Sequence, residues 1–125
     1  MSYVSEAVKA KFLNIQNEML NRILNQNFDF VEIGVFGSYA RNEYNALSDV
    51  DICVIVKEMP TRYITGWLRD DAEELGADIC FITEEQFESS DTIFMNNLRR
   101  DYRRIYGGKK WLLWSRLRYF RLFRR

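Results

Sequence analysis

Apolar residues recur along the chain with two different spacings, and each spacing predicts a different kind of element. Between residues 3 and 26 they return every three or four positions, as on one face of a helix; the positions are Val4, Val8, Phe12, Ile15, Met19 and Ile23. Short apolar runs at 31–36, 50–56 and 77–82 are typical of strands. We therefore expect one long helix followed by three strands.

Helix-breaking residues divide the rest of the chain. Residues 39–44 have helical character directly after the first strand, and Pro60 precedes a helix expected over 62–75 that Gly76 ends. A last helix is expected over about 91–105. This order of elements predicts an α/β fold, with a small mixed β-sheet flanked by helices.

Length and composition suit one packed domain. The chain has 125 residues, and 47% of them are hydrophobic, which is ample for a single core. No segment approaches the roughly 20 apolar residues of a membrane span, and the N-terminal residues lack the apolar centre of a secretory signal. We therefore expect a cytoplasmic protein.

The chain contains no histidine. This excludes Ser-His and Cys-His nucleophilic centres, imidazole general bases and the common zinc hydrolase sites. Cys53 and Cys80 fall inside apolar strand runs, where a free thiol behaves as a small hydrophobe, so we expect neither a structural disulfide nor a zinc site. An enzyme with this sequence would have to work with carboxylates and metal ions.

Two carboxylates open the strand at 50–56, where packing alone does not explain them. Asp49 and Asp51 are separated by one residue, so on a strand they project to the same side, about 7 Å apart. They repel each other unless a cation lies between them. Mg²⁺ is the cation that proteins commonly share between carboxylates and nucleotide phosphates, and two such ions can act together in an in-line displacement.

A glycine-serine pair supplies a second chemical feature. Gly37 and Ser38 follow the strand at 31–36 directly and precede the short helical segment. Glycine lets the backbone approach a phosphate closely, and free N–H groups at a helix start attract anions. The Ser38 hydroxyl adds a donor. The sequence thus predicts a phosphate site beside a metal site.

Together these motifs resemble the signature of the nucleotidyltransferase superfamily related to DNA polymerase beta, in which G-S-x-A-R-G is followed by S-D-x-D. The matching positions are Gly37, Ser38, Ala40, Arg41, Ser48, Asp49 and Asp51. The final glycine of the first motif is replaced by Asn42, which also tolerates turn conformations. The resemblance covers about residues 25–107, closes near Ile105-Tyr106, and implies the polymerase beta-like nucleotidyltransferase fold.

The resemblance also implies a third carboxylate on a neighbouring strand. Asp78, near the start of the strand at 77–82, would complete a site for two Mg²⁺ ions with Asp49 and Asp51. By the same analogy it would accept a proton from the attacking hydroxyl group.

The nucleotide-binding residues implied by the resemblance are Gly37, Ser38, Arg41 and Ser48. For Arg41 the sequence supports two roles equally: packing of the motif helix, and contact with the phosphates. For Ser48 we favour a turn or cap role over a catalytic one.

A domain of this size has no room for a separate acceptor-binding domain. In this it is similar to the minimal nucleotidyltransferases that act as antitoxins beside a HEPN-domain ribonuclease toxin and transfer AMP from ATP to a tyrosine of the toxin. The resemblance implies a protein adenylyltransferase with a HEPN-type partner, although the motifs do not select among ATP, GTP, CTP and UTP. Two alternatives stay open: a nucleotide-binding regulatory subunit without turnover, and a homodimer that modifies a small molecule such as an antibiotic.

Charge is distributed unevenly along the chain. Residues 1–98 contain 7 Lys/Arg and 17 Asp/Glu, a net charge of −10, whereas residues 99–125 contain 11 Lys/Arg and one Asp, a net charge of +10. We expect the nucleotidyltransferase domain over 1–107 and a basic aromatic tail over 108–125. Such a tail suits single-stranded nucleic acid, an anionic membrane surface or an acidic protein face. Docking onto a partner or onto the acidic domain, or an altered reading frame, would also account for it.

Overall fold

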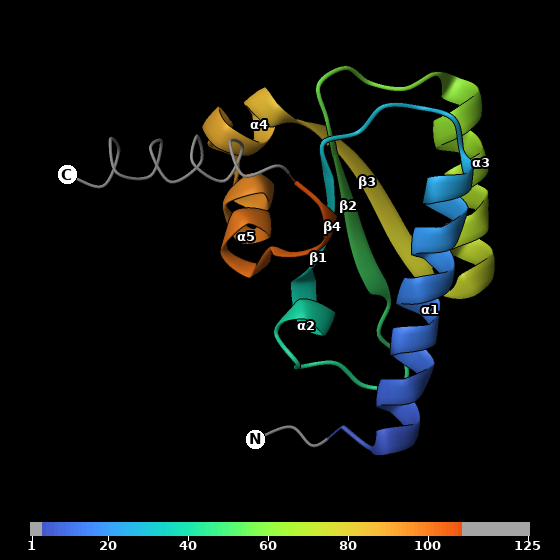
Figure 1. The fold of residues 1–125 in the computed structure, drawn as a ribbon. Coiled ribbons are helices and arrows are strands. Elements are labelled where there is room, and N and C mark those ends of the chain that lie inside the picture. Colours follow the sequence, from blue (N-terminus) through green and yellow to red (C-terminus); the bar gives the residue numbers. More distant parts are fainter. Residues whose placement is uncertain (1–3, 109–125) are drawn as a thin grey trace.

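A single mixed β-sheet with helices on both faces makes up residues 4–108, the part of the chain that the computed structural model describes (Figure 1). The elements in chain order are α1 (Glu6–Asn25), β1 (Glu32–Phe36), α2 (Gly37–Ala40), β2 (Val50–Val56), α3 (Arg62–Leu75), β3 (Ala77–Thr83), α4 (Glu84–Ser89), α5 (Ile93–Asp101) and β4 (Arg103–Gly107). The strand order is β3-β2-β1-β4. β1 is antiparallel to β2 and β4, and β2 is parallel to β3.

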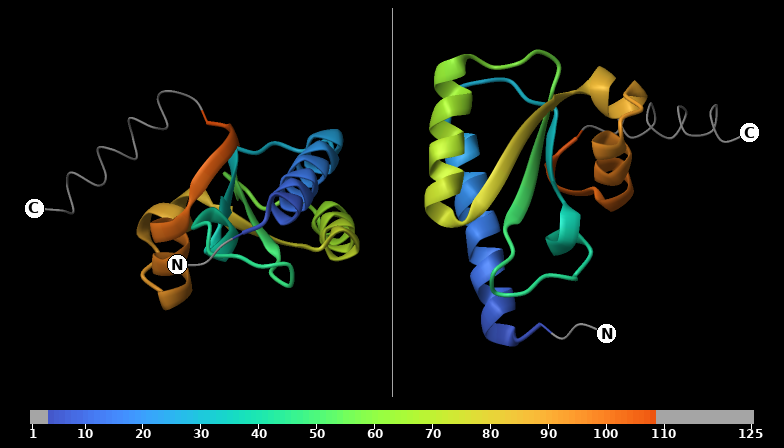
Figure 2. Two further views of the ribbon diagram at one scale, coloured as in Figure 1. Left: turned by 90° about the horizontal axis from the view of Figure 1, so that it is seen from below. Right: turned by 180° about the vertical axis from the view of Figure 1, so that it is seen from behind.

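Different helices cover the two faces of the sheet. α1 and α3 lie on one face, α4 and α5 lie on the other, and α2 continues from the end of β1 (Figures 1 and 2). The even-numbered residues of β2 belong to the core under α1 and α3, whereas Cys53 and Ile55 belong to the core under α4 and α5. Because side chains alternate along a strand, Asp51 projects to the side of α4 and α5.

The expected elements with clear end signals match the structure well. β2 and α3 occupy residues 50–56 and 62–75, as the sequence predicted. Thr61 caps the start of α3 by accepting a hydrogen bond from the backbone N–H of Ile64, and Gly76 ends the helix in the left-handed conformation, with φ 84°.

The helix expected over 39–44 is wrong in position and length. The structure has α2 instead, a single turn that starts at Gly37. The chain then leaves the helix through Asn42, whose φ of 60° is the turn conformation that asparagine tolerates. The motif segment is therefore a tight strand-to-turn corner rather than a helix of its own.

The single helix expected over 91–105 is also wrong. α5 ends at Asp101, and the next residues form β4, which pairs with β1 at the edge of the sheet. Tyr102, between α5 and β4, contacts β1: its ring packs on Gly34, where any side chain would overlap it, and its hydroxyl donates a hydrogen bond of 2.5 Å to Glu32. The pair at 105–106 therefore lies in a strand.

The corner at Gly37 is anchored to α1 by aromatic packing. Tyr39 and Tyr44 pack against Phe12 of α1, with ring centroids 5.9 and 4.7 Å from the Phe12 ring. The Tyr39 hydroxyl also donates a hydrogen bond of 2.7 Å to Gln16. A long helix thus fixes the place of the motif.

Three sequence-level expectations concern the chain as a whole. Cys53 and Cys80 are free thiols that lie opposite each other on β2 and β3. Within residues 4–108, none of the helices combines the length and apolar character that a membrane span requires. The roles expected for the basic tail concern residues 109–125, which lie outside the described residues.

Candidate active site

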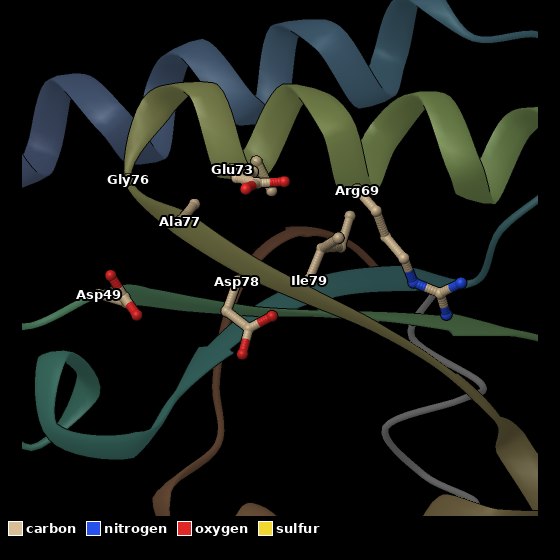
Figure 3. Close-up of a pocket in the computed structure, with 8 residues that line it drawn as sticks. Asp49, Arg69, Glu73, Gly76, Ala77, Asp78 and Ile79 are labelled. Atoms are coloured by element: carbon tan, nitrogen blue, oxygen red, sulfur yellow. The ribbon is translucent and has the colours of Figure 1, made fainter.

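Asp51 and Asp78 are direct partners in the parallel pairing of β2 with β3. Paired residues of neighbouring strands point to the same face, so both carboxylates project to the side of α4 and α5. In Figure 3, Asp78 points away from α3, whereas Ala77 and Ile79 point toward that helix. Asp49 lies directly before β2, at the same end of the sheet. All three predicted carboxylates therefore belong to the same end of β2 and β3.

The ionisation of Asp51 reflects this closeness. The pKa of Asp51 is raised from 3.8 to about 6, first by burial and then by the negative charges of Asp78 and Asp49, against an opposing effect of Arg41. A partly buried carboxyl group beside two others ionises more readily when a cation is bound near it. The local electrostatics thus favour binding of a positively charged ion.

Gly37 lies against the same carboxylate from the other side. Phe36 is the β1 partner of Asp51, and Gly37 follows it with φ 72°, a conformation that favours glycine. A Cβ atom at position 37 would overlap the carboxylate oxygen Oδ2 of Asp51. The predicted phosphate corner and the predicted metal ligand are therefore in contact.

Ser38 and Ser48 differ in what surrounds them. Ser48 Oγ accepts a hydrogen bond from the backbone N–H of Asn45 at 3.0 Å, and Ser48 N donates to the Asn45 carbonyl group, also at 3.0 Å. Ser48 is thus a turn residue in this structure, and the nucleotide contact that the resemblance implies for it stays a prediction. The Ser38 hydroxyl is half-buried on α2 and makes no hydrogen bond with the residues that the structure describes.

Arg41 joins the motif corner to the end of α5. Its guanidinium group donates a hydrogen bond of 2.5 Å to Asp101 and lies 3.6 Å from the carboxylate of Glu43. Asp101 is almost fully buried and also accepts from Arg100 at 2.9 Å. Arg41 therefore packs α2 against α5, while its charge still acts on Asp51. Sequence reasoning missed Asp101, because no local pattern links two residues sixty positions apart.

A pocket of about 380 Å³ borders the carboxylates along the edge strand β3. Asp49 and Asp78 line it together with the charged side chains of Arg69 and Glu73 on α3 (Figure 3). Arg69 also lies over the ring of Phe81, 5.8 Å from its centroid. Neither α3 residue belongs to a motif, so the sequence offered no signal for this pocket.

The donor chemistry of the three aspartates fits Mg²⁺, which prefers oxygen ligands and is often held by one or two carboxylates plus phosphate oxygens. The side chains are close enough for two of them to raise the pKa of Asp51. Within residues 4–108, however, no three His, Cys, Asp or Glu side chains are already arranged around one point to hold a metal ion. The aspartates are thus suitable ligands in a site that is not fully preformed.

Sequence comparisons point to one family. The profile of the nucleotidyltransferase domain matches residues 18–106, which include the three aspartates and both motifs. A candidate protein adenylyltransferase of Methanocaldococcus jannaschii is 50% identical over 42 residues, which are 34% of this chain and 40% of that protein. The chain thus matches less than half of the length of that relative.

Comparison with solved structures gives the same fold at low sequence identity. A chain of the tri-AMPylated Shewanella oneidensis HEPN toxin in complex with its MNT antitoxin has a TM-score of 0.59 and 15% identity, over 90% of this chain and 86% of that one. A toxin-antitoxin structure with AMP-PNP has a TM-score of 0.59 and 17% identity, over 86% of each chain. A candidate nucleotidyltransferase from Sulfolobus solfataricus has a TM-score of 0.58 and 19% identity, over 88% and 95%.

Proposed function

The chain belongs to the nucleotidyltransferase domain family and has its polymerase beta-like fold, and we propose that it transfers AMP from ATP to a hydroxyl group of a partner protein. The observation that carries this proposal is the contact between Gly37 and Asp51 beside the Asp51–Asp78 strand pair. The corner at Gly37 is suited to phosphates, and the neighbouring carboxylates are suited to cations. One nucleotide with its bound metal ions could therefore contact both.

Gly37 and Ser38 would bind the part of the nucleotide that leaves. With no side chain at position 37, the backbone comes close to the Asp51 carboxylate, and a backbone of this kind could also approach a phosphate closely. The half-buried Ser38 hydroxyl would donate a hydrogen bond to a phosphate oxygen. Arg41 would act mainly through its bond to Asp101, which holds the corner in place.

Asp49, Asp51 and Asp78 would hold Mg²⁺, which when bound neutralises phosphate charge and helps to align the α-phosphate. The acceptor oxygen forms a bond to the α-phosphorus, the bond between the α- and β-phosphates breaks, and pyrophosphate leaves. The hydroxyl proton passes to the carboxylate of Asp78. Positioning and charge neutralisation supply most of the rate in such reactions.

A protein acceptor is supported by the relatives. The M. jannaschii relative is named for protein adenylylation, and one structural neighbour is a complex that contains an AMPylated HEPN toxin. We therefore propose a HEPN-type protein as the partner of this chain, and an antitoxin role for the transfer.

Labelled ATP tests the proposal. The chain is incubated with Mg²⁺, ATP labelled in the α-phosphate, and the protein encoded beside it. Label should move to the neighbour with wild type and not with the Asp49→Ala, Asp51→Ala double variant. Asp70→Asn, which alters an exposed carboxylate of α3 outside the pocket, serves as the matched control and should keep full transfer. No transfer by wild type, or equal transfer by the double variant, would contradict the proposal.

A further inference from the structure

The strand order places the parts of the site in a line across one end of the sheet. Gly37 follows β1, Asp51 lies on β2, and Asp78 lies on β3, which is the edge strand. The pocket lined by Arg69 and Glu73 comes next, between β3 and α3. Along the strand order, the phosphate corner lies at the β1 end of the carboxylates, and this pocket, which Asp49 and Asp78 also line, lies at the β3 end.

The geometry of an in-line displacement indicates from which side of the carboxylates the acceptor would approach. In the proposed reaction the attacking oxygen must approach the α-phosphorus from the side opposite the leaving pyrophosphate. If pyrophosphate leaves at Gly37 and Ser38, the acceptor hydroxyl arrives from the side of Asp78. The pocket along β3 is thus the place where the residue that carries this hydroxyl would lie, with its neighbours against α3.

The two α3 side chains differ in the contacts that they already make within the protein. Arg69 lies over the ring of Phe81, toward the far end of the pocket, and Glu73 stands above Ala77 on the α3 side of β3 (Figure 3). The Asp78 carboxylate points to the other side of the strand and lines the same pocket at its edge. Glu73 is exposed, and among the described residues it takes part in none of the ion pairs. With Asp49 and Asp78 bound to Mg²⁺, Glu73 remains as the carboxylate that can contact the acceptor.

Resting on the proposed function, we propose that this pocket selects the acceptor, and that Glu73 pairs with an arginine or lysine next to the hydroxyl-bearing residue. The substrate class is then a peptide segment in which a basic side chain adjoins the acceptor hydroxyl. Glu73 is a specificity-determining residue that touches the acceptor and takes no part in bond formation. Charge complementarity of this kind mainly sets which partner is accepted.

Two synthetic peptides of equal length provide the test. Each contains one tyrosine, flanked in one peptide by arginines and in the other by glutamates. Their binding to the whole chain is measured by fluorescence anisotropy with Mg²⁺ and α,β-methylene-ATP, which cannot release pyrophosphate. Wild type should bind the arginine peptide at least about tenfold more tightly, since one favourable charge contact of roughly 1.4 kcal/mol corresponds to tenfold.

Variants of α3 separate this inference from the proposed function. Glu73→Lys should reverse the preference, and Glu74→Gln should leave it unchanged, because Glu74 faces Arg22 of α1 at 3.5 Å. Equal binding of the two peptides by wild type, or an unchanged preference in Glu73→Lys, would overturn the inference. Because the readout is binding, it decides the inference even if no AMP is transferred, whereas loss of transfer bears on the proposed function alone.

Discussion

Gly37 lies so close to Asp51 that a Cβ atom at position 37 would overlap the Asp51 carboxylate oxygen Oδ2. This contact ties the end of β1 to the start of β2 at the point where the proposed chemistry takes place. It also explains why a glycine stands here beyond its φ of 72°. The absence of a side chain at position 37 thus leaves the space that the Asp51 carboxylate occupies.

Substitution of this glycine should therefore damage both folding and turnover. Gly37→Ala should lower the free energy of unfolding by about 1–3 kcal/mol, because the left-handed backbone is strained by a side chain and Asp51 must move. AMP transfer should fall by at least about a hundredfold, since the carboxylate is displaced. Urea unfolding and a transfer assay at saturating ATP measure the two effects.

Gly66→Ala is the matched control. This glycine lies inside α3, and a Cβ atom there would meet nothing within 4 Å. Alanine should stabilise the helix by about 0.5–1 kcal/mol and leave transfer unchanged. If the two glycine variants behave alike, the contact between position 37 and Asp51 has no functional meaning.

The raised pKa of Asp51 predicts that its ionised carboxylate lowers the free energy of unfolding, and that this loss depends on pH. Its pKa in the folded protein is about 6, above the ordinary 3.8, so between these values the folded state binds more protons than the unfolded state. Stability then falls as the pH rises through this window, and the loss is complete above it. In EDTA, Asp51→Asn should melt about 4 °C or more above wild type at pH 8 and at the same temperature at pH 4.

Added Mg²⁺ provides the internal check on that result. At pH 8 it should raise the melting temperature of wild type and leave Asp51→Asn nearly unchanged, because a ligand stabilises only the state that binds it. A variant that is no more stable than wild type at pH 8 in EDTA would show that Asp51 carries no electrostatic cost.

The pair formed by Arg41 and Asp101 should have the opposite pH dependence. The pKa of Asp101 is lowered, first by its hydrogen bond from Arg100 and then by Arg41, so its contribution is present above the ordinary pKa and is lost as the pH falls through the lowered value. Asp101→Asn should cost about 1–3 kcal/mol at pH 7, since it weakens charge-assisted hydrogen bonds at a nearly buried site. The difference in the free energy of unfolding between wild type and Asp101→Asn should disappear in acid. A cost that persists unchanged well below pH 3.8 would assign it to packing instead.

Alanine substitution of the two motif serines, Ser38 and Ser48, should have different effects on catalysis and stability. Ser38→Ala should lower kcat/KM for ATP about tenfold to a hundredfold, because a hydrogen bond to a charged phosphate contributes roughly 1.5–3 kcal/mol. Ser48→Ala should mainly loosen the turn at Asn45, with a stability loss near 1 kcal/mol and a small kinetic effect. Steady-state kinetics of both variants measures this difference. A larger fall in kcat/KM for Ser48→Ala than for Ser38→Ala would indicate that Ser48 contacts the nucleotide.

Local signals explain why much of the fold was predictable. The strand at 50–56 is a continuous apolar run, and the helix at 62–75 has a threonine cap and a glycine end. The spacing of Asp49 and Asp51 and the family resemblance predicted three carboxylates on neighbouring strands, and in the structure Asp51 pairs with Asp78 while Asp49 lies directly before β2.

The missed elements depend on distant contacts or on signals that were overlooked. β4 is a mostly exposed edge strand rich in arginine, so its sequence resembles the helix before it, and only pairing with β1 makes it a strand. α4 does have a local signal, the capping box formed by Thr83 and Gln86, which marks a separate helix start. The α3 side of the pocket has no local signal, because Glu73 and Asp78 line one pocket only once α3 packs on β3.

Calorimetric titration with α,β-methylene-ATP shows whether the three aspartates bind metal and nucleotide together. Wild type should bind the analogue with Mg²⁺ and at least tenfold more weakly in EDTA, and both Asp51→Asn and Asp78→Asn should remove the dependence on Mg²⁺. Equal affinity with and without Mg²⁺, or unchanged Mg²⁺ dependence in both variants, would contradict a metal-dependent nucleotidyltransferase site at Asp49, Asp51 and Asp78.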